Sequence, residues 1–258
     1  MLLRRVAHHI KDQNWFAVAI DFAIVVLGVF IGIQVSNWNT DRANRALAED
    51  YLARLVVDIE IEAQLWDKAQ DYFGVARKYG ESALADFDRP VDDLDINFLI
   101  ALYQASQVWF VAPNRATFDE LQSTGRIVFI EDPALRTTLS QHYLRSAQTG
   151  VTMNRTSQYR RIARLYLHPD IQSAIRTNCG DQWVTDENNF YYVDLPSSCE
   201  IDAPETLVKE QLIALHANEE VERELRFHLS VLDAYIGVMG NTQETAQSTI
   251  KRLREVSP

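Results

Sequence analysis

One ionisable side chain, Asp21, lies inside a long apolar run, and of all residues in the chain it most directly suggests chemistry. The run extends from Phe16 to Val35 and holds no other charged residue. A carboxyl group in a membrane is costly unless it finds a donor, a cation or a proton, so it marks a functional position by default. Three interpretations stay open: a structural hydrogen bond across a helix pair or to the nearer headgroup layer, a proton or ion carrier held by a multi-span partner, and a contact with a partner of another kind.

The helical neighbours of Asp21 favour a side chain that faces protein. At about 100° per residue, Gly28, Gly32 and Ser36 lie within about 60° of Asp21 on one stripe. Gly28 and Gly32 have the small-xxx-small spacing that lets two helix backbones approach closely in a membrane. We therefore expect helix association through Asp21, Gly28, Gly32 and Ser36, which we call the association face.

No motif indicates catalysis or metal binding. The six histidines form no metal-binding pair with an acid at a recognised spacing, and the nearest case, His216 with Glu219, is better explained as a solvated helix face. The chain has no glycine-rich phosphate loop, no nucleophile elbow and no dinucleotide fingerprint. We expect no enzymatic activity, no cofactor and no metal.

The two cysteines, Cys179 and Cys199, lie in a segment that we expect to be an irregular insert, residues 177–203. In an oxidising compartment they would form a disulfide worth about 3 kcal/mol, and the alternative is two unrelated thiols. Aromatic residues between them predict either a local core or an exposed contact surface; these are Trp183, Phe190, Tyr191 and Tyr192.

The element that must position Asp21 is a helix long enough to cross a bilayer. Residues 16–35 give about 30 Å of helix, and Trp15 and Trp38 bracket them where indoles prefer to anchor at the interface. A buried core helix of a soluble protein and a cleaved signal peptide are the alternatives, and the apolar run is long for both. We expect a cytoplasmic segment at 1–14, a transmembrane signal-anchor helix at 15–38 and a periplasmic helical domain at 39–258.

Charge supports this orientation and excludes one class of partner. Arg4, Arg5 and Lys11 against Asp12 give residues 1–14 a net charge of +2, whereas the whole chain carries −11. Positive residues stay on the cytoplasmic side of a bacterial membrane, so we expect the N-terminus inside an inner membrane and the domain in the periplasm. Such an acidic chain, with no basic stripe, is not typical of a nucleic-acid binder.

Beyond the span the pattern predicts an all-α antiparallel helical bundle. Apolar residues recur at steps of three or four over 40–80, in a helix continuous with the span, and again in a last long helix that begins near Pro204. We expect Gly240 to kink or split that last helix, residues 127–130 to form a short strand or an extended connector, and Gly125 to close a helix. The arginines of residues 151–176 are expected to pair with the acidic helices; they are Arg155, Arg160, Arg161 and Arg164.

Two stretches resemble an uncharacterised bacterial family, domain of unknown function 6090. One is the span that ends in Gln34-Val-Ser-Asn-Trp38-Asn39, preceded by an acid and by Gly28; the other is Thr117-Phe-Asp-Glu-Leu-Gln-Ser-Thr-Gly125, followed by Ile130 and Leu135. Members commonly carry Glu where this chain has Asp21, and the cysteine insert has no counterpart in the family. The resemblance implies a single-span protein with a helical extramembrane region, and it implies no activity.

The sequence thus favours a non-enzymatic accessory or scaffold subunit that lies in the lipid bilayer and assembles with itself or with another inner-membrane protein. Two alternatives stay open. A periplasmic ligand-sensing bundle would have to signal through a partner, because 14 residues are too short for an output domain. An ion-coupling subunit would use Asp21 together with a multi-span partner.

Overall fold

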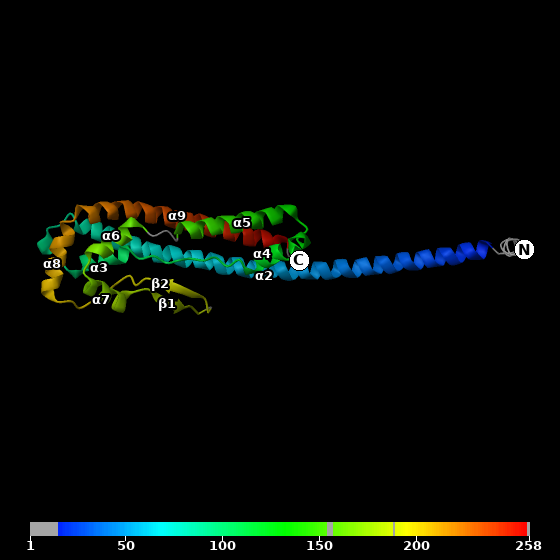
Figure 1. Cartoon of the computed structure of the whole chain (residues 1–258), viewed down its shortest axis with the longest axis horizontal. Helices are drawn as coiled ribbons and strands as arrows, with labels where there is room; N and C mark the ends of the chain where they lie inside the picture. The colour runs from blue at the N-terminus through cyan, green and yellow to red at the C-terminus, as the bar shows by residue number, and fades with distance from the viewer. Residues whose placement is uncertain (1–14, 154–156, 188, 257–258) are drawn as a thin grey trace, which may run out of the picture. The chain divides into compact units, whose positions relative to one another are not determined.

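The computed structural model describes residues 15–153, 157–187 and 189–256 (Figure 1). The basic segment 1–14 and Arg155, on which two of the expectations above depend, lie outside these residues. Within them the chain is predominantly α-helical, with a single two-stranded sheet. The expected helical class is therefore confirmed for the part of the chain that the structure describes.

The chain divides into two compact units, Met1–Asp50 and Tyr51–Pro258. Helix α2, Trp15–Asp86, contributes to both, so the helix expected over residues 40–80 is continuous with the apolar run. Within residues 16–35 the described apolar side chains are exposed, among them Phe22 at 71%. This is a helix long and apolar enough to cross a membrane, and none of its most apolar window is buried against protein, which disfavours the core-helix alternative.

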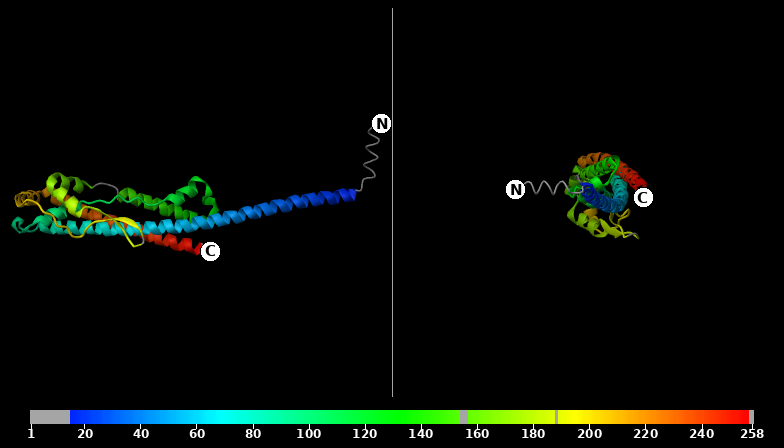
Figure 2. Two further views of the ribbon diagram at one scale, coloured as in Figure 1. Left: turned by 90° about the horizontal axis from the view of Figure 1, so that it is seen from below. Right: turned by 90° about the vertical axis from the view of Figure 1, so that its right-hand side faces the viewer.

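The second unit is built on the remainder of α2 and on helix α9, Glu219–Val256, which run antiparallel. Three side-chain hydrogen bonds between the helices show this direction, because the residue number rises along α2 as it falls along α9. They join Glu60 with Arg254, Gln70 with Gln243, and Arg77 with Asp233. Helix α5, Pro133–Met153, lies along α9 in both views (Figures 1 and 2). Apolar stripes on these long helices bury one another, as the antiparallel arrangement requires.

Shorter elements complete the unit around the long helices (Figure 1). They are η1 (Val91–Asp93), α3 (Ile96–Ala105), α4 (Ala116–Ser123), η2 (Arg126–Phe129), α6 (Gln158–Tyr166), α7 (Pro169–Cys179), β1 (Gln182–Thr185), β2 (Tyr191–Asp194) and α8 (Glu205–His216). Helix α3 is buried on every side from Phe98 to Ala105, which explains why its sequence is apolar all round. Its start is set by Asp95, whose carboxylate accepts the backbone N–H of Asn97 at 2.8 Å.

Local chemistry explains where several elements begin and end. Gly125 has a φ of +70°, so it ends α4 in the left-handed conformation that the sequence predicted for it. Asp132 caps α5 through the backbone N–H of Ala134 at 2.8 Å.

Three expectations about local structure were wrong. Residues 127–130 were expected to form a short strand or an extended connector, but Arg126–Phe129 form the short helix η2 and only Ile130 is extended. The last helical region is interrupted at Asn218, whose side chain caps the new helix α9 through the backbone N–H groups of Glu220 and Val221. Gly240 does not break α9; a Cβ there would lie 3.2 Å from Gln70 Oε1, so this glycine serves close helix packing.

Candidate functional site

The association face lies on α2 in the first unit. A Cβ added at Gly28 or Gly32 would meet no atom of the described chain within 4 Å, so the surface there is open to a close neighbour. At Ser36 the backbone carbonyl accepts the hydroxyl of Thr40 at 3.0 Å. The role of the association face remains a prediction, since the structure holds this chain alone.

Of the two indoles expected at the membrane interfaces, only Trp38 has a described side chain. The guanidinium of Arg42 lies 6.0 Å from its ring centroid, one helical turn further along α2. An amphipathic ring beside a cation suits the boundary between lipid and water. The side chain of Trp15 lies outside the described atoms, so its anchoring role remains a prediction.

In the second unit a polar cluster that the sequence did not predict lies inside the bundle. Glu62 of α2 is fully buried; one of its carboxylate oxygens accepts the indole N–H of Trp66 at 3.0 Å, and the other lies 3.2 Å from Nε2 of His142. Both Glu62 and His142 sit on the apolar stripes of their helices, between residues that are themselves buried. In the sequence, only the presence of two polar residues at apolar-stripe positions could have indicated this pair, because 80 residues separate the partners.

Three further polar atoms around this pair have no hydrogen-bond partner among the described residues: His142 Nδ1, Tyr143 Oη and Ser146 Oγ. Burial, together with the nearby carboxylates of Glu62 and Asp58, raises the pKa of the Tyr143 hydroxyl well above its usual range. The pair of Glu62 and His142 is sealed from solvent and joins α2 to α5. Buried polar pairs of this kind favour one packing arrangement of their helices.

A second polar cluster surrounds the end of α3, where two arginines of α6 meet the carbonyl groups of that helix. Arg160 donates to the backbone oxygen of Ser106 at 2.5 Å, and Arg164 donates to Gln107 Oε1 at 2.8 Å and to the Ser106 hydroxyl at 3.3 Å. The guanidinium of Arg164 also stacks on the ring of Tyr103, 4.4 Å from its centroid. We call Arg160, Arg164 and Tyr103 the arginine cluster.

The arginine cluster corrects the expectation that Arg160 and Arg164 would pair with acidic helices. Carbonyl groups at a helix end lack intrahelical donors and carry partial negative charge, so they attract guanidinium groups. Both side chains are half-buried, and burial lowers the pKa of each guanidinium from its usual value.

Asp181 is the carboxylate nearest to the arginine cluster. It accepts the hydroxyl of Tyr72 at 2.8 Å, and burial among its neighbours raises its pKa, an effect that the bond from Tyr72 and the charges of Arg160 and Arg164 partly oppose. More than a third of the residue is nevertheless exposed. Among the described residues it forms no ion pair with either arginine, so their positive charge is not cancelled by direct contact.

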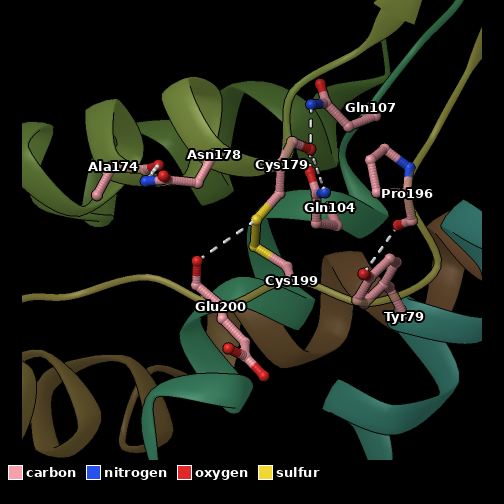
Figure 3. Close-up of a disulfide and its surroundings, with 9 residues drawn as sticks. All are labelled: Tyr79, Gln104, Gln107, Ala174, Asn178, Cys179, Pro196, Cys199 and Glu200. Carbon is pink, nitrogen blue, oxygen red and sulfur yellow. Dashed lines mark hydrogen bonds between the residues drawn. A yellow bond between two sulfur atoms is a disulfide. The ribbon is translucent and has the colours of Figure 1, made fainter.

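The disulfide between Cys179 and Cys199 lies next to this site (Figure 3). Its Cα atoms are 5.5 Å apart, and Cys179 is the last residue of α7. The amide of Gln104 donates to the Cys179 carbonyl at 2.7 Å, and the amide of Gln107 donates to Gln104 Oε1 at 3.3 Å (Figure 3). A chain of hydrogen bonds therefore joins the disulfide to Gln107, the residue that both arginines contact.

Gly180 connects the disulfide to Asp181 and tolerates no side chain. A Cβ at this position would lie 2.5 Å from the backbone oxygen of Arg176, a clash that only backbone movement could relieve. The glycine thus lets the chain leave α7 tightly and places Asp181 beside Tyr72.

The expected irregular insert contains a hairpin in which Trp183 pairs with Val193 and Thr185 with Tyr191. Trp183 and Tyr191 stack at 4.8 Å between centroids and are 62% and 58% exposed. Val193 on the same hairpin is buried. Of the aromatic residues, Trp183 and Tyr191 therefore form an exposed surface, whereas Tyr192 is half-buried against the core that includes Val193.

Comparisons with protein-family models, with curated proteins and with solved structures find no match to this chain.

The resemblance to domain of unknown function 6090 accordingly remains a prediction, as does the absence of enzymatic activity. The structure brings Cys179 and Cys199 together as a bonded pair and places Asp21, Gly28, Gly32 and Ser36 on one helix. Sequence reasoning missed the pair of Glu62 with His142 and the arginine cluster, because their partners lie more than 50 residues away along the chain.

Proposed function

We propose that this protein is a non-enzymatic subunit, anchored in a bacterial inner membrane by the first part of α2, that assembles with itself or with another membrane protein through the association face. One observation carries the proposal. An exposed apolar stretch of helix, long enough to cross a bilayer, holds a single carboxylate on the same stripe as two glycines that have open space beside them.

The physical argument starts from Asp21. Within hydrocarbon a carboxyl group has no water to bond, so it is stabilised by a donor on a neighbouring helix or by protonation. Gly28 and Gly32 would let that neighbour approach closely along the same stripe. Both features favour one protein-facing side of the helix over a helix surrounded by lipid.

Orientation is argued from charge and from redox chemistry. The basic residues within 1–14 favour a cytoplasmic N-terminus. The disulfide supports a second unit in the periplasm, since such bonds persist in oxidising compartments and are rare in the cytosol. Membership of the family of domain of unknown function 6090 would agree with this arrangement.

Ion coupling is the second candidate function, and the position of Asp21 is the observation that favours it. An acid in a span can bind and release a proton or cation when a multi-span partner encloses it. This function needs that partner, whereas self-association does not. The two candidates therefore differ in what co-purifies with the chain.

The test uses full-length chains carrying two different tags, co-expressed and isolated in mild detergent through one tag. We expect the second tag, or a defined membrane protein, to co-purify, and we expect Gly28→Ile and Asp21→Asn each to reduce recovery at least fivefold, about 1 kcal/mol of association free energy. Ala23→Ile is the matched control, because it adds a side chain on the opposite side of the same helix.

A lone monomer for the wild-type chain would refute the assembly proposal. Equal losses for Ala23→Ile and Gly28→Ile would remove the association face as its cause. A multi-span companion lost only in Asp21→Asn would favour ion coupling. A periplasm-dependent reporter fused after Pro258 tests the orientation, which its inactivity would overturn.

A further inference from the structure

The arginine cluster holds more hydrogen-bonding capacity than the described chain uses. A guanidinium offers five N–H donors in a planar fork. Arg160 donates through Nη1, and Arg164 donates through Nε and Nη2. Within the described residues, Arg160 Nε and Nη2 and Arg164 Nη1 have no hydrogen-bond acceptor assigned, and both side chains keep one side open to solvent.

Tyr103 gives an independent indication of a ligand. The residue is 1% exposed, and its hydroxyl has no hydrogen-bond partner among the described residues. A buried hydroxyl without a partner costs free energy, and the cost vanishes when a ligand accepts its proton. Its ring lies under the Arg164 guanidinium, 4.4 Å from the centroid.

The charge balance selects the kind of ligand. Among the described residues one carboxylate, Asp181, acts on Arg160 and Arg164 without forming an ion pair, and Arg176 adds a third positive charge near Arg164. Positive charge is therefore in excess, which favours an anionic ligand. The guanidinium fork matches the two oxygens of a carboxylate.

We propose that the arginine cluster binds a small monocarboxylate, with the carboxylate accepting from Arg160, Arg164 and the hydroxyl of Tyr103. Asp181 is exposed, and within the described residues it accepts only from Tyr72, through Oδ1. Its second oxygen suits a ligand that carries a donor, of which the α-ammonium group of an amino acid is the simplest. The proposal does not depend on assembly through the span, because all these groups belong to Tyr51–Pro258.

The relay through Gln107 and Gln104 links this site to the disulfide, and Gly180 positions Asp181 between them. Gln107 Oε1 accepts from both arginines, so it fixes their orientation before a ligand arrives. Such preorganisation lowers the entropy that a ligand would otherwise lose on binding.

The test is calorimetric titration of the full-length protein in detergent with acetate, propionate, glycine and alanine at constant ionic strength, with sulfate and phosphate as comparison anions. We expect saturable binding of at least one monocarboxylate that is tenfold or more tighter than that of either inorganic anion. Binding of the amino acids alone would identify Asp181 as the site of the ammonium group, and binding of the simple acids would leave the carboxylate as the recognised feature.

Variants separate a ligand site from a purely structural cluster. Tyr103→Phe removes only an unpartnered hydroxyl, so the ligand-free protein should be at least as stable as the wild type, while affinity for the carboxylate should fall by about tenfold. Arg164→Gln should weaken binding further. Arg161→Gln is the matched control, since Arg161 is an exposed neighbour on the same helix, and it should bind as the wild type does.

Three results would overturn the proposal. The first is the absence of saturable binding by every monocarboxylate tested. The second is binding of sulfate or phosphate as tight as that of the carboxylates, which would indicate a general anion effect. The third is unchanged affinity in Tyr103→Phe, which would show that the hydroxyl does not touch the ligand.

Discussion

Replacing His142 by Leu is expected to destabilise the second unit by about 3–5 kcal/mol. The reason is that Glu62 is fully buried and accepts only two described bonds, from the indole of Trp66 and from the imidazole of His142. Removing one partner of a buried pair leaves an uncompensated charge, which is the costly case. For a unit of this size, roughly 2–4 °C of melting temperature correspond to 1 kcal/mol, so we expect a fall of about 6–20 °C.

Glu62→Gln is the informative companion to His142→Leu. The glutamine keeps an oxygen for the Trp66 indole and presents an amide to His142 without a charge, so the loss should stay below about 1.5 kcal/mol. In the double variant the cost of the buried charge disappears, and the two changes should be less than additive by at least about 1.5 kcal/mol.

The measurement is thermal unfolding of the full-length protein in detergent, followed by far-UV circular dichroism. Gln141→Leu is the matched control, because it makes a comparable change at the exposed neighbouring position of α5. The reasoning would be refuted if His142→Leu melted within about 2 °C of the wild type, or if Glu62→Gln cost as much as His142→Leu.

Three more predictions concern single features of the second unit, and each is read from thermal unfolding of the full-length protein. Cys179→Ser with Cys199→Ser removes a disulfide whose cysteines are 20 positions apart, so we expect a loss of about 3 kcal/mol, and an unchanged melting temperature after reduction would contradict this. Gly74→Ala should stabilise α2 by about 0.5–1 kcal/mol, because the added Cβ meets open space. Gly80→Ala should not give this stabilisation, because the added Cβ would lie 2.8 Å from Leu229 Cδ2 of α9. Equal stabilisation by the two variants would show that α9 does not pack against Gly80. Burial lowers the pKa of His228 below its unfolded value of about 6.5, so near and below that pH the unfolded chain binds more protons at this residue than the folded chain does. The free energy of unfolding is therefore unaffected by His228 protonation above about pH 6.5 and decreases as the pH falls below that value. His228→Gln, whose amide keeps a donor for the Ala105 carbonyl, should therefore lose less stability than the wild type between about pH 7 and pH 5, and parallel profiles would argue against it.

Sequence periodicity predicted the elements whose stability comes from a continuous apolar stripe. Leu55, Ile59, Trp66 and Phe73 were expected on one face of α2, and all four are buried. The role of Gly125 was also predictable, because it acts on its immediate neighbours. These features depend on spacing along the chain, which is what a sequence displays.

Features that depend on distant partners could not be predicted in the same way. Gly240 suggested a kink because glycine weakens an isolated helix, yet its lack of a side chain admits Gln70, 170 positions earlier. Arg160 and Arg164 suggested ion pairs by their charge, yet Arg160 binds the Ser106 carbonyl and Arg164 binds the Ser106 hydroxyl and the Gln107 side chain. In both cases tertiary contacts outweighed the local preference.

The antiparallel pairing of α2 with α9 has a consequence for biosynthesis. Gln70 and Gln243 are bonded across 173 of the 258 positions, so the face of α2 that packs on α9 waits for about two-thirds of the elongation time before its partner is synthesised. During that interval the apolar stripe of α2 is exposed and forms a binding surface for chaperones. If translation stopped early, or if a protease removed α9, the apolar stripe of α2 would remain exposed. Chaperones and proteases would then recognise this exposed apolar surface.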